Sequence, residues 1–488
     1  MVEERRRSGL ANRLQIFLYC EVCRHECRHG TQECARHLPR ASYAQIHECG
    51  AQRETRAVSR LRRIAGERRV GLDKNARVTT QARYPSQFMA TPLEGLRVLD
   101  FSHALAGPFC TMLMAQYGAD VYKIESLDGE LGRSWAPPFV EGEAAFFLGV
   151  NAGKRSLAIN LKKPEGLALC LEMIAHADVL IENMRPGTLD RLGLGYAAAR
   201  ALNPRLIYCS VSGYGQNGPS RDDPAMDLIL QAASGLISVT GVEDGEQVRC
   251  GHSVADITSG MFALIGILLA IEARNRTGEG QLVDVSMLDS MISAMASNYA
   301  NFFGANYDGA RIVPGPLGTR FGTIVPYRGF PTADRDIVIA VASGKLWVDF
   351  CGAIGRPDLA EHPDYSTNAL RVKNREVLEP LIASIFRTRP SAHWVAHLRA
   401  CGIPCAPVKT LDEVGQDAQA AQRGMFQEVG GFTVTGPPVK LSATPGSIPR
   451  PAPHLGEHTR EALAELLGCD EAALDRIESS GVIRGRVT

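Results

Sequence analysis

The sequence predicts an α/β protein built on a parallel sheet, with a second and smaller α/β domain behind it in the chain. From Met89 onward, short apolar segments typical of strands alternate with helical stretches, a pattern that favours a parallel sheet. Beyond Thr323 the alternation restarts, which indicates a second domain. A chain of 488 residues is long enough for about two or three domains with a large buried core.

Apolar segments bounded by glycine or polar residues mark the strands of both domains. The first domain is predicted to hold strands at 96–101, 119–125, 156–161, 178–182, 205–211 and 281–286. The second is predicted to begin with strands at 324–330 and 336–341.

Helices are predicted between these strands. One follows Gly107-Pro108, and another begins at Pro164, because proline is favoured in the first turn of a helix. The longest apolar run, Met261–Ile271, is shorter than the roughly 18–20 residues that a membrane span needs. It predicts a buried helix.

Composition argues against two classes of partner. The chain has 53 Lys+Arg and 53 Asp+Glu, so its charge favours neither a nucleic acid nor a membrane surface. Apolar content of 45% and charged content of 22% are typical of a globular protein in water. Cysteines scattered through apolar segments fit reduced thiols, so we expect a cytoplasmic protein, or one of the mitochondrial matrix if the source is eukaryotic.

Residues 1–88 differ from the rest of the chain. They carry 18 Lys+Arg against 9 Asp+Glu and five of the thirteen cysteines, without sustained apolar periodicity. A zinc site on Cys20, Cys23, Cys27 and Cys34 is an alternative, but this spacing fits no standard finger. The acidic residues argue against a mitochondrial transit peptide. The favoured interpretation is a disordered extension, or one outside the native protein with Met89 as the natural start.

A glycine-rich motif at 213–218 matches G-x-G-x-x-G and follows a predicted strand. The dinucleotide fingerprint needs a helix directly after its glycines, because the helix N-terminus holds the pyrophosphate. The residues that follow, Pro219–Pro224, predict a loop instead. The motif therefore indicates a glycine-rich active-site loop and not a nicotinamide or flavin site.

Four polar segments stand at the ends of predicted strands, where open α/β sheets bind their ligands. Lysine and arginine in such segments pair well with phosphate oxygens. The pattern predicts an anionic ligand, with phosphate groups as candidates. The segments are Phe101–Pro108, Asn151–Ser156, Glu182–Gly187 and Val254–Gly260.

These segments, taken in order with others, resemble the family III CoA-transferases, the CaiB/BaiF group, from about Pro92 to Leu467. The matching pieces are Leu93–Phe101, Gly118–Glu125, Asn151–Ser156, Val179–Asn183, Ser210–Pro219, Asp256, Thr277–Gln281, Gly402–Pro407 and Leu455–Thr459.

The resemblance implies an interlocked homodimer, in which each chain forms a large Rossmann-like domain, crosses to a small domain and returns. On this basis we expect a large domain with the CoA site at 89–305, a linker and active-site loop at 306–322, a small domain at 323–425, and a return to the large domain at 426–488.

In that family a carboxylate in the segment matching Val254–Gly260 is the nucleophile, which points to Asp256. Its attack on an acyl-CoA gives a mixed anhydride and then an aspartyl-CoA thioester, a route that needs neither ATP nor a metal. CoA is then the only cofactor expected, as a co-substrate. Asp256 also fits the N-cap of the following helix, and the two roles are compatible.

The resemblance implies further site residues. Asp227 matches an acidic position near the site, and Leu105 and Arg320 fall in the acyl site. Leu105 stands where formyl-CoA transferase has glutamine, which disfavours formyl or oxalate substrates. Lys162, Arg191 and Arg320 also fit ordinary surface positions. The CoA-binding residues implied are His103, Ala104 and Ala106 at the thiol end, and Lys162, Asn183, Met184, Arg191 and Leu192 around the phosphates and adenine.

Two other functions compete with CoA transfer. A 2-methylacyl-CoA racemase of the same fold places a histidine just before the position of Asp227, where this chain has Met226, which cannot carry a proton. A CoA-binding protein without activity would leave Asp256 without a role. Within the transferases, the resemblance is closest to the succinyl-CoA-dependent branch, such as succinate–hydroxymethylglutarate CoA-transferase, which implies a dicarboxylate acceptor. The stretches that match this branch are Gly322–Tyr327, Tyr365–Asn368 and Leu370–Arg375.

Overall fold

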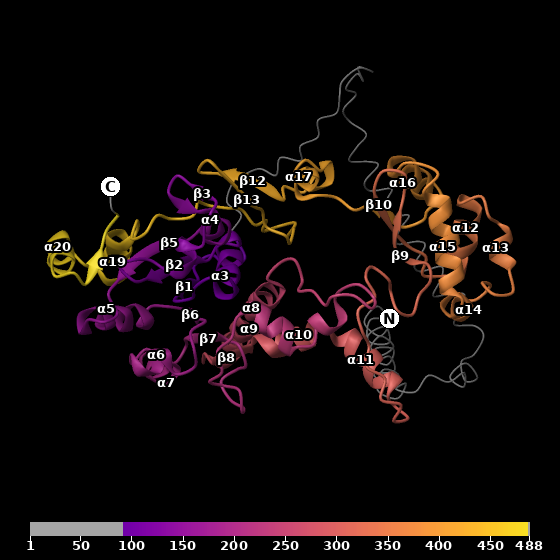
Figure 1. The fold of residues 1–488 in the computed structure, drawn as a ribbon. Coiled ribbons are helices and arrows are strands. Elements are labelled where there is room, and N and C mark those ends of the chain that lie inside the picture. The colour runs from indigo at the N-terminus through magenta and orange to yellow at the C-terminus, as the bar shows by residue number, and fades with distance from the viewer. Residues whose placement is uncertain (1–90, 487–488) are drawn as a thin grey trace, which may run out of the picture. The chain divides into compact units, whose positions relative to one another are not determined.

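The structure is a computed structural model that describes residues 91–486 (Figure 1). The extension expected at 1–88, with its zinc alternative, lies outside the described residues.

A seven-stranded sheet forms the centre of the fold, in the order β14-β5-β2-β1-β6-β7-β8. The six strands from β5 to β8 in this order run parallel, and β14 pairs with β5 in the antiparallel direction. The parallel sheet predicted from the sequence is therefore confirmed, and β14 is an addition to it. The strands are β1 (Arg97–Asp100), β2 (Asp120–Glu125), β5 (Arg155–Ile159), β6 (Val179–Glu182), β7 (Ile207–Ser212), β8 (Leu282–Ser286) and β14 (Ile483–Arg484).

The order of the parallel strands reverses between β1 and β6. Counted along the chain, the six parallel strands have the doubly wound order 3-2-1-4-5-6, and ligands of such sheets bind outside the strand ends at the reversal. Leu99 pairs with Leu180 there, and the Phe101 N–H donates to the Ile181 carbonyl at 2.9 Å. The segments that follow β1 and β6 therefore emerge side by side.

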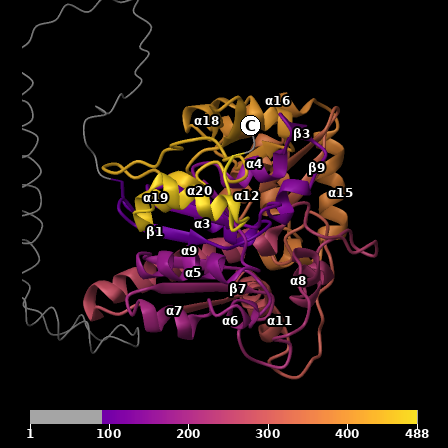
Figure 2. The same ribbon diagram turned by 90° about the vertical axis from the view of Figure 1, so that its left-hand side faces the viewer.

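Helices cover both faces of this sheet, because successive strand residues point to opposite sides. Val98 belongs to a core cluster with the helices of one face, and Leu99 to a cluster with those of the other. In Figure 2 the C-terminal helix α19 lies on the sheet, where it contacts β5, although the two are far apart in sequence. The first face holds α3 (Ala106–Gln116), α9 (Val254–Thr277) and α10 (Met287–Ala294), and the second holds α5 (Pro164–Ala175), α7 (Tyr196–Leu202), α19 (Thr459–Leu467) and α20 (Glu471–Ser479).

Helix α9 extends the buried helix predicted at Met261–Ile271. By length and composition alone it is apolar enough to cross a membrane, but Ala263 and Ile267 are buried in the core beneath the sheet. Its other face is exposed, with Leu269 at 66%. The helix is therefore buried on one side only, which differs from the prediction.

A second, three-stranded sheet has its own core. Its strands are antiparallel, in the order β11-β10-β9, and Trp347, Phe350 and Phe386 are buried against it. The two strands predicted near its start are confirmed, while the exact domain limits stay a prediction. This part contains β9 (Tyr327–Pro331), β10 (Asp336–Ala340), β11 (Cys405–Pro407), α12 (Gly344–Ala353), α13 (Asp358–Glu361), α14 (Asn368–Lys373), α15 (Arg375–Phe386) and α16 (Ser391–Ala400).

Shorter elements connect these parts. They are η2 (Leu131–Ser134), β3 (Phe139–Val140), β4 (Glu143–Ala144), α4 (Ala145–Asn151), α6 (Thr188–Arg191), α8 (Asp227–Ala233), η3 (Ile237–Val239), α11 (Ala296–Ala305), α17 (Leu411–Gly415), α18 (Ala418–Gln422), β12 (Phe426–Val429) and β13 (Phe432–Thr435).

Candidate active site

Asp256 lies in the first turn of α9. The N-cap of this helix is Ser253, so the interpretation of Asp256 as the N-cap is wrong: it is the third helical residue. One turn later, a Cβ on Gly260 would stand 2.6 Å from the Ala106 carbonyl oxygen, so only glycine lets α9 approach α3 this closely. The position also suits a carboxylate, because the N-terminus of a helix favours negative charge.

A cavity of about 570 Å³ opens beside Asp256. It collects side chains from the loops after β1, β6 and β7, that is, from the edge of the sheet where the strand order reverses. Six of the residues predicted from the resemblance lie together here. They are His103, Ala104, Asn183, Met184, Asp227 and Asp256.

Asp227 holds the start of α9. It is the first residue of α8, and its Oδ1 accepts the Ala255 N–H at 2.8 Å and the Asp256 N–H at 3.4 Å. Its Oδ2 accepts Gln231 Nε2 at 2.7 Å. Burial, followed by the negative charge of Asp227, raises the pKa of Asp256 to about 7. The two carboxylates are thus coupled through geometry and charge.

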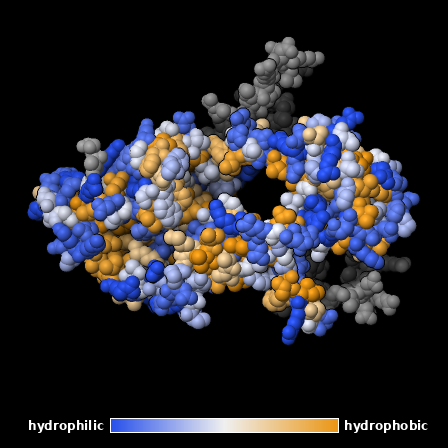
Figure 3. Space-filling model, viewed as in Figure 1, coloured by the Kyte–Doolittle hydropathy of each residue, from blue (hydrophilic) through white to orange (hydrophobic). Residues whose placement is uncertain are grey.

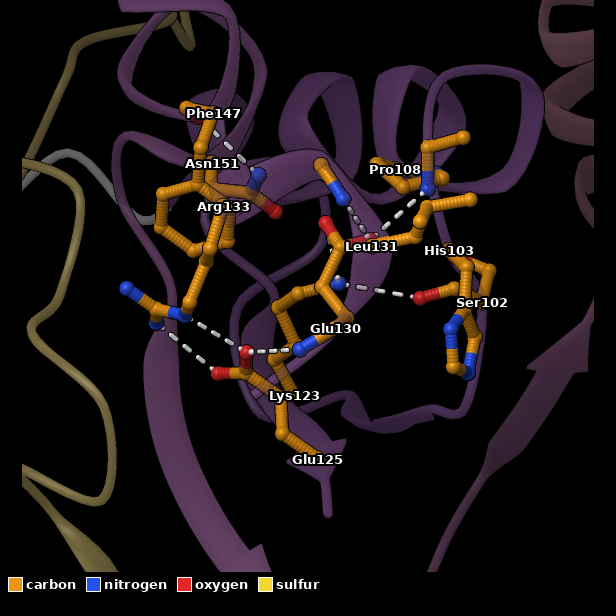
Figure 4. A network of polar contacts seen from close by, with 12 residues as sticks. Ser102, His103, Pro108, Lys123, Glu125, Glu130, Leu131, Arg133, Phe147 and Asn151 are labelled. Carbon is orange, nitrogen blue, oxygen red and sulfur yellow. Dashed lines mark hydrogen bonds and ion pairs between the residues drawn. The ribbon is translucent and has the colours of Figure 1, made fainter. Parts of the chain in front are cut away.

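The loop after β1 is fixed by side chains of other elements, of which Lys123 and Glu130 are buried (Figure 4). Lys123 Nζ donates to the Ser102 carbonyl at 2.9 Å. Asn183 both accepts the His103 N–H at 2.7 Å and donates to the His103 carbonyl at 2.9 Å. The Ala104 N–H donates to Glu130 Oε2 at 3.0 Å. These contacts fix the backbone of His103 and Ala104 where the two residues line the cavity.

Ala104 adopts a left-handed backbone conformation, with φ at 61°. Such a conformation costs a residue with a Cβ roughly 1–2 kcal/mol, and it persists only where the surroundings enforce it. Burial and the nearby charge of Lys123 lower the pKa of His103, which favours a neutral imidazole at the cavity.

A second cavity, of about 250 Å³, lies at the ends of β2 and β5. Lys162 lines it, and His103 and Met184 line both this cavity and the larger one. Lys162 is therefore close to the other predicted CoA residues. Its backbone N–H donates a hydrogen bond to Asn160 Oδ1 at 3.1 Å.

The expectation that Asn151–Ser156 binds an anion is wrong. This segment enters β5 at the strand's amino end, and Lys154 is fully buried with its ammonium 3.1 Å from Asp100 and 2.9 Å from the Pro108 carbonyl. Arg155 pairs with Glu465 at 2.6 Å. Both cations are already neutralised by the protein, so neither is available to a phosphate.

Four other predicted residues do not line either cavity. Leu105 and Ala106 are buried in the core, at 8% and 1% exposure. Leu192 packs against the core on the other face of the sheet, and Arg191 donates to Thr188 Oγ1 at 3.1 Å on the exposed side of α6.

Arg320 is also outside the cavity. Its guanidinium pairs with Glu379 at 2.8 Å, with Glu376 at 3.7 Å, and with Glu243. Its side chain is 17% exposed. Within one chain, Arg320 is therefore ion-paired and mostly buried, which differs from the surface position that was the alternative.

Three arginines that line the large cavity were not predicted from the sequence as site residues: Arg185, Arg221 and Arg249. Arg185 stands within the polar segment after β6, which was the one available signal. Arg221 pairs with Asp222 at 2.7 Å. Arg249 precedes α9 in a loop without a recognisable motif, and its position is set only by the fold. Arg185 and Arg249, which pair with no carboxylate among the described residues, make the cavity suitable for an anionic substrate.

No group of three or more His, Cys, Asp or Glu side chains in residues 91–486 is arranged to hold an ion.

Comparison with known proteins identifies relatives over most of the chain. Residues 93–459 match CoA-transferase family III. The succinyl-CoA:glutarate CoA-transferase of Mus musculus is 39% identical over 81% of this chain and 91% of its own. The succinate–glutarate CoA-transferase of Agrobacterium fabrum is 36% identical over 77% of this chain and 96% of its own.

Solved structures agree with these relatives. A CaiB/BaiF family protein from Brucella suis superposes with a TM-score of 0.70 at 34% identity, covering 77% of this chain and all of its own. Rv3272 from Mycobacterium tuberculosis gives a TM-score of 0.69 at 30% identity, covering 76% of this chain and 99% of its own.

Proposed function

Because the chain belongs to family III of the CoA-transferases, we propose that it moves CoA from succinyl-CoA to a short dicarboxylic acid, with Asp256 as the nucleophile. The observation that carries the proposal is the half-buried Asp256 carboxylate at the start of α9, facing a cavity that also holds His103 and Asn183. A helix N-terminus stabilises the ionised form that attacks.

The reaction balances without a net proton or an external energy source. Asp256 attacks the thioester carbonyl, the C–S bond breaks, and CoA leaves as thiolate, so that a mixed anhydride forms between Asp256 and the succinyl group. The thiolate then attacks the aspartyl carbonyl, which frees succinate and leaves CoA as a thioester on Asp256. The acceptor carboxylate attacks this thioester, which releases CoA thiolate and forms a second mixed anhydride on Asp256. The thiolate then attacks the acceptor's carbonyl, which gives the new acyl-CoA and restores the Asp256 carboxylate. The covalent intermediates on Asp256 divide one difficult exchange into several easier steps.

The dicarboxylate assignment draws on the relatives and on the charge of the cavity. Relatives from mouse, Agrobacterium and Haloarcula are named for succinyl-CoA or succinate with glutarate or mesaconate, all dicarboxylates. One carboxylate must reach Asp256, so the other needs a cation. Arg320 remains our first candidate from the resemblance, but it would have to leave Glu379 and Glu243. The cavity's own arginines are nearer alternatives.

A panel of acceptor acids tests the substrate class. With succinyl-CoA as donor, we expect glutarate and other short dicarboxylic acids to exceed monocarboxylic acids of equal length by about 10- to 150-fold in kcat/KM, since a charge-assisted contact contributes about 1.5–3 kcal/mol. Product acyl-CoA is measured by chromatography. An equal or greater rate with butyrate or valerate would contradict the dicarboxylate assignment while leaving CoA transfer itself intact.

Racemisation of a 2-methylacyl-CoA is not favoured by the site. Met226, which occupies the position before Asp227, is 60% exposed and lines the cavity. Its thioether carries no exchangeable proton, so the second acid/base group that proton transfer at both faces of a carbon requires is missing at this position.

We propose further that the large domain is Rossmann-like, which fits its doubly wound strand order. We also propose that two copies of the chain associate through α9. Only 39% of the most apolar 18-residue window of α9 is buried in one chain. Apolar residues gather over α8 to α11 in Figure 3. A patch of this kind marks an association surface, and a second copy is the partner that the family resemblance implies. The exposed apolar residues are Met226, Leu228, Ile229, Met261, Ile265, Leu268, Leu269, Ile292 and Phe303.

Light scattering on the purified protein tests this association. We expect the mass of a dimer for the wild type and loss of dimer in Leu269→Glu, because the new charge would be buried at the interface. Val377→Glu on α15 is the matched control, since Val377 and Leu269 are both 66% exposed. A monomeric wild type, or equal effects of the two variants, would contradict the α9 interface.

A further inference from the structure

We propose that Glu130 is a positioning residue that holds the loop after β1 in the conformation needed for reaction at Asp256. The proposal rests on the proposed function, because its consequence is a loss of CoA transfer. It is carried by the contacts that Glu130 makes with Ala104, Gly132 and Lys123 (Figure 4).

The Glu130 carboxylate is fixed from two sides. Glu130 caps η2, and its Oε2 accepts the Gly132 N–H at 2.7 Å. Its Oε1 stands 3.7 Å from Lys123 Nζ, and neither side chain is more than 1% exposed. Within residues 91–486, Oε1 has no hydrogen-bond partner, so this oxygen is held by the charge of Lys123 alone. The carboxylate therefore cannot rotate away from the loop without separating a buried ion pair.

Its remaining contact is with the reactive loop. Oε2 also accepts the Ala104 N–H at 3.0 Å, at the residue whose φ is 61°. Ala104 is half-buried, and a left-handed backbone conformation is unfavourable for alanine. The hydrogen bond to Glu130 therefore opposes a backbone that would otherwise relax toward a right-handed conformation.

The neighbouring contacts hold only the first part of the loop. Lys123 binds the Ser102 carbonyl and Asn183 binds both backbone groups of His103. Among the described residues, Glu130 is the side chain that binds the backbone at Ala104. Its removal would leave His103 attached and release Ala104, which lines the cavity together with Asp256.

Kinetics of variants test this role. Glu130→Ala should lower kcat by about 10- to 100-fold, because a displacement of about 1 Å in a reacting group costs up to about 100-fold. We expect a smaller change in KM for succinyl-CoA, since Lys162 and Asn183 remain. Glu130→Gln, which keeps an acceptor oxygen, should retain more activity than Glu130→Ala.

Rescue by glycine separates positioning from general stability. Glycine enters left-handed conformations without the strain of a Cβ, so Glu130→Ala/Ala104→Gly should recover roughly fivefold or more of the lost kcat. Asp178→Asn is the control: it changes an ion-paired carboxylate, 3.0 Å from Arg274, before the amino end of β6 and away from the cavity. It should lower Tm without lowering kcat at a temperature where the protein is folded.

Amide hydrogen exchange gives a readout that does not depend on activity. In the wild type the Ala104 N–H should be protected, and in Glu130→Ala the peptide spanning 102–106 should exchange about 10- to 100-fold faster, as expected for a released segment. Unchanged exchange and kcat within threefold of wild type in a folded Glu130→Ala variant would overturn the inference. Full activity of Asp256→Asn would instead overturn the proposed function, so the two failures are distinguishable.

Discussion

Replacing Asp256 by asparagine should lower kcat/KM for CoA transfer by roughly 10³- to 10⁶-fold, the range seen when a nucleophile is removed from an enzyme. An amide of the same shape does not attack a thioester, and it cannot form the anhydride or the thioester that follows. The fold should survive, because the Asp256 side chain is not the N-cap of α9; Ser253 is. Steady-state exchange between succinyl-CoA and glutarate measures the loss, and circular dichroism checks the fold.

Asp289→Asn is the matched control for this variant. Asp289 is the third helical residue of α10 after the N-cap Ser286, so it stands at the same helical position as Asp256 after Ser253. It lines no cavity described above. Both variants remove a favourable charge from a helix N-terminus, but only Asp256→Asn removes the nucleophile. Comparable losses in the two variants, or near-normal turnover by Asp256→Asn, would contradict the assignment.

The second large effect is expected in the pH dependence of the reaction rate. Burial and the charge of Asp227 raise the pKa of Asp256 to about 7, and only the ionised carboxylate is a nucleophile. The rate of the first half-reaction should therefore rise with pH and level off above about 8. At pH 5, about two units below this pKa, roughly one carboxyl in a hundred is ionised, so the rate should be about 100-fold below the plateau.

Asp227→Asn tests the origin of this profile. Removing the neighbouring negative charge makes ionisation of Asp256 easier, so its pKa falls and the midpoint of the profile should move to lower pH. Single-turnover experiments with succinyl-CoA between pH 5 and 9 measure the midpoint without the ionisation of an acceptor acid. A profile that is flat over this range, or a midpoint that stays in place in Asp227→Asn, would contradict the coupling of the two carboxylates.

The sheet could be predicted from the sequence where local pattern and tertiary structure agree. Ala119–Glu125 follows a glycine, contains the strand-forming residues Val121, Tyr122 and Ile124, and forms β2 within one residue of the prediction. Strand β14 could not be predicted, because it has two residues and exists only through pairing of Ile483 with Ile159 far earlier in the chain. The exposed face of α9 was missed for a related reason: an apolar run does not show which of its sides packs.

The position of a site residue was predictable where a family motif singles it out, as for Asp256 and Asn183, which both line the large cavity. It was not predictable where the partner of a charge lies elsewhere in the sequence. Lys154 resembles a phosphate ligand until the fold brings Asp100 to 3.1 Å from its ammonium group. Glu130 has no motif, and its importance follows only from the contact with Ala104. Arg249 likewise reaches the cavity through the fold alone.

Trapping the covalent intermediate tests the central claim most directly. Enzyme quenched during turnover with succinyl-CoA can be cleaved with trypsin, which separates Cys250–Arg274, with Asp256, from Asp222–Arg249, with Asp227. We predict that CoA is attached to Asp256 in the first peptide, and that this species is absent in Asp256→Asn. Attachment of CoA to the second peptide, or turnover with neither peptide modified under conditions that preserve an aspartyl-CoA thioester, would contradict catalysis through Asp256.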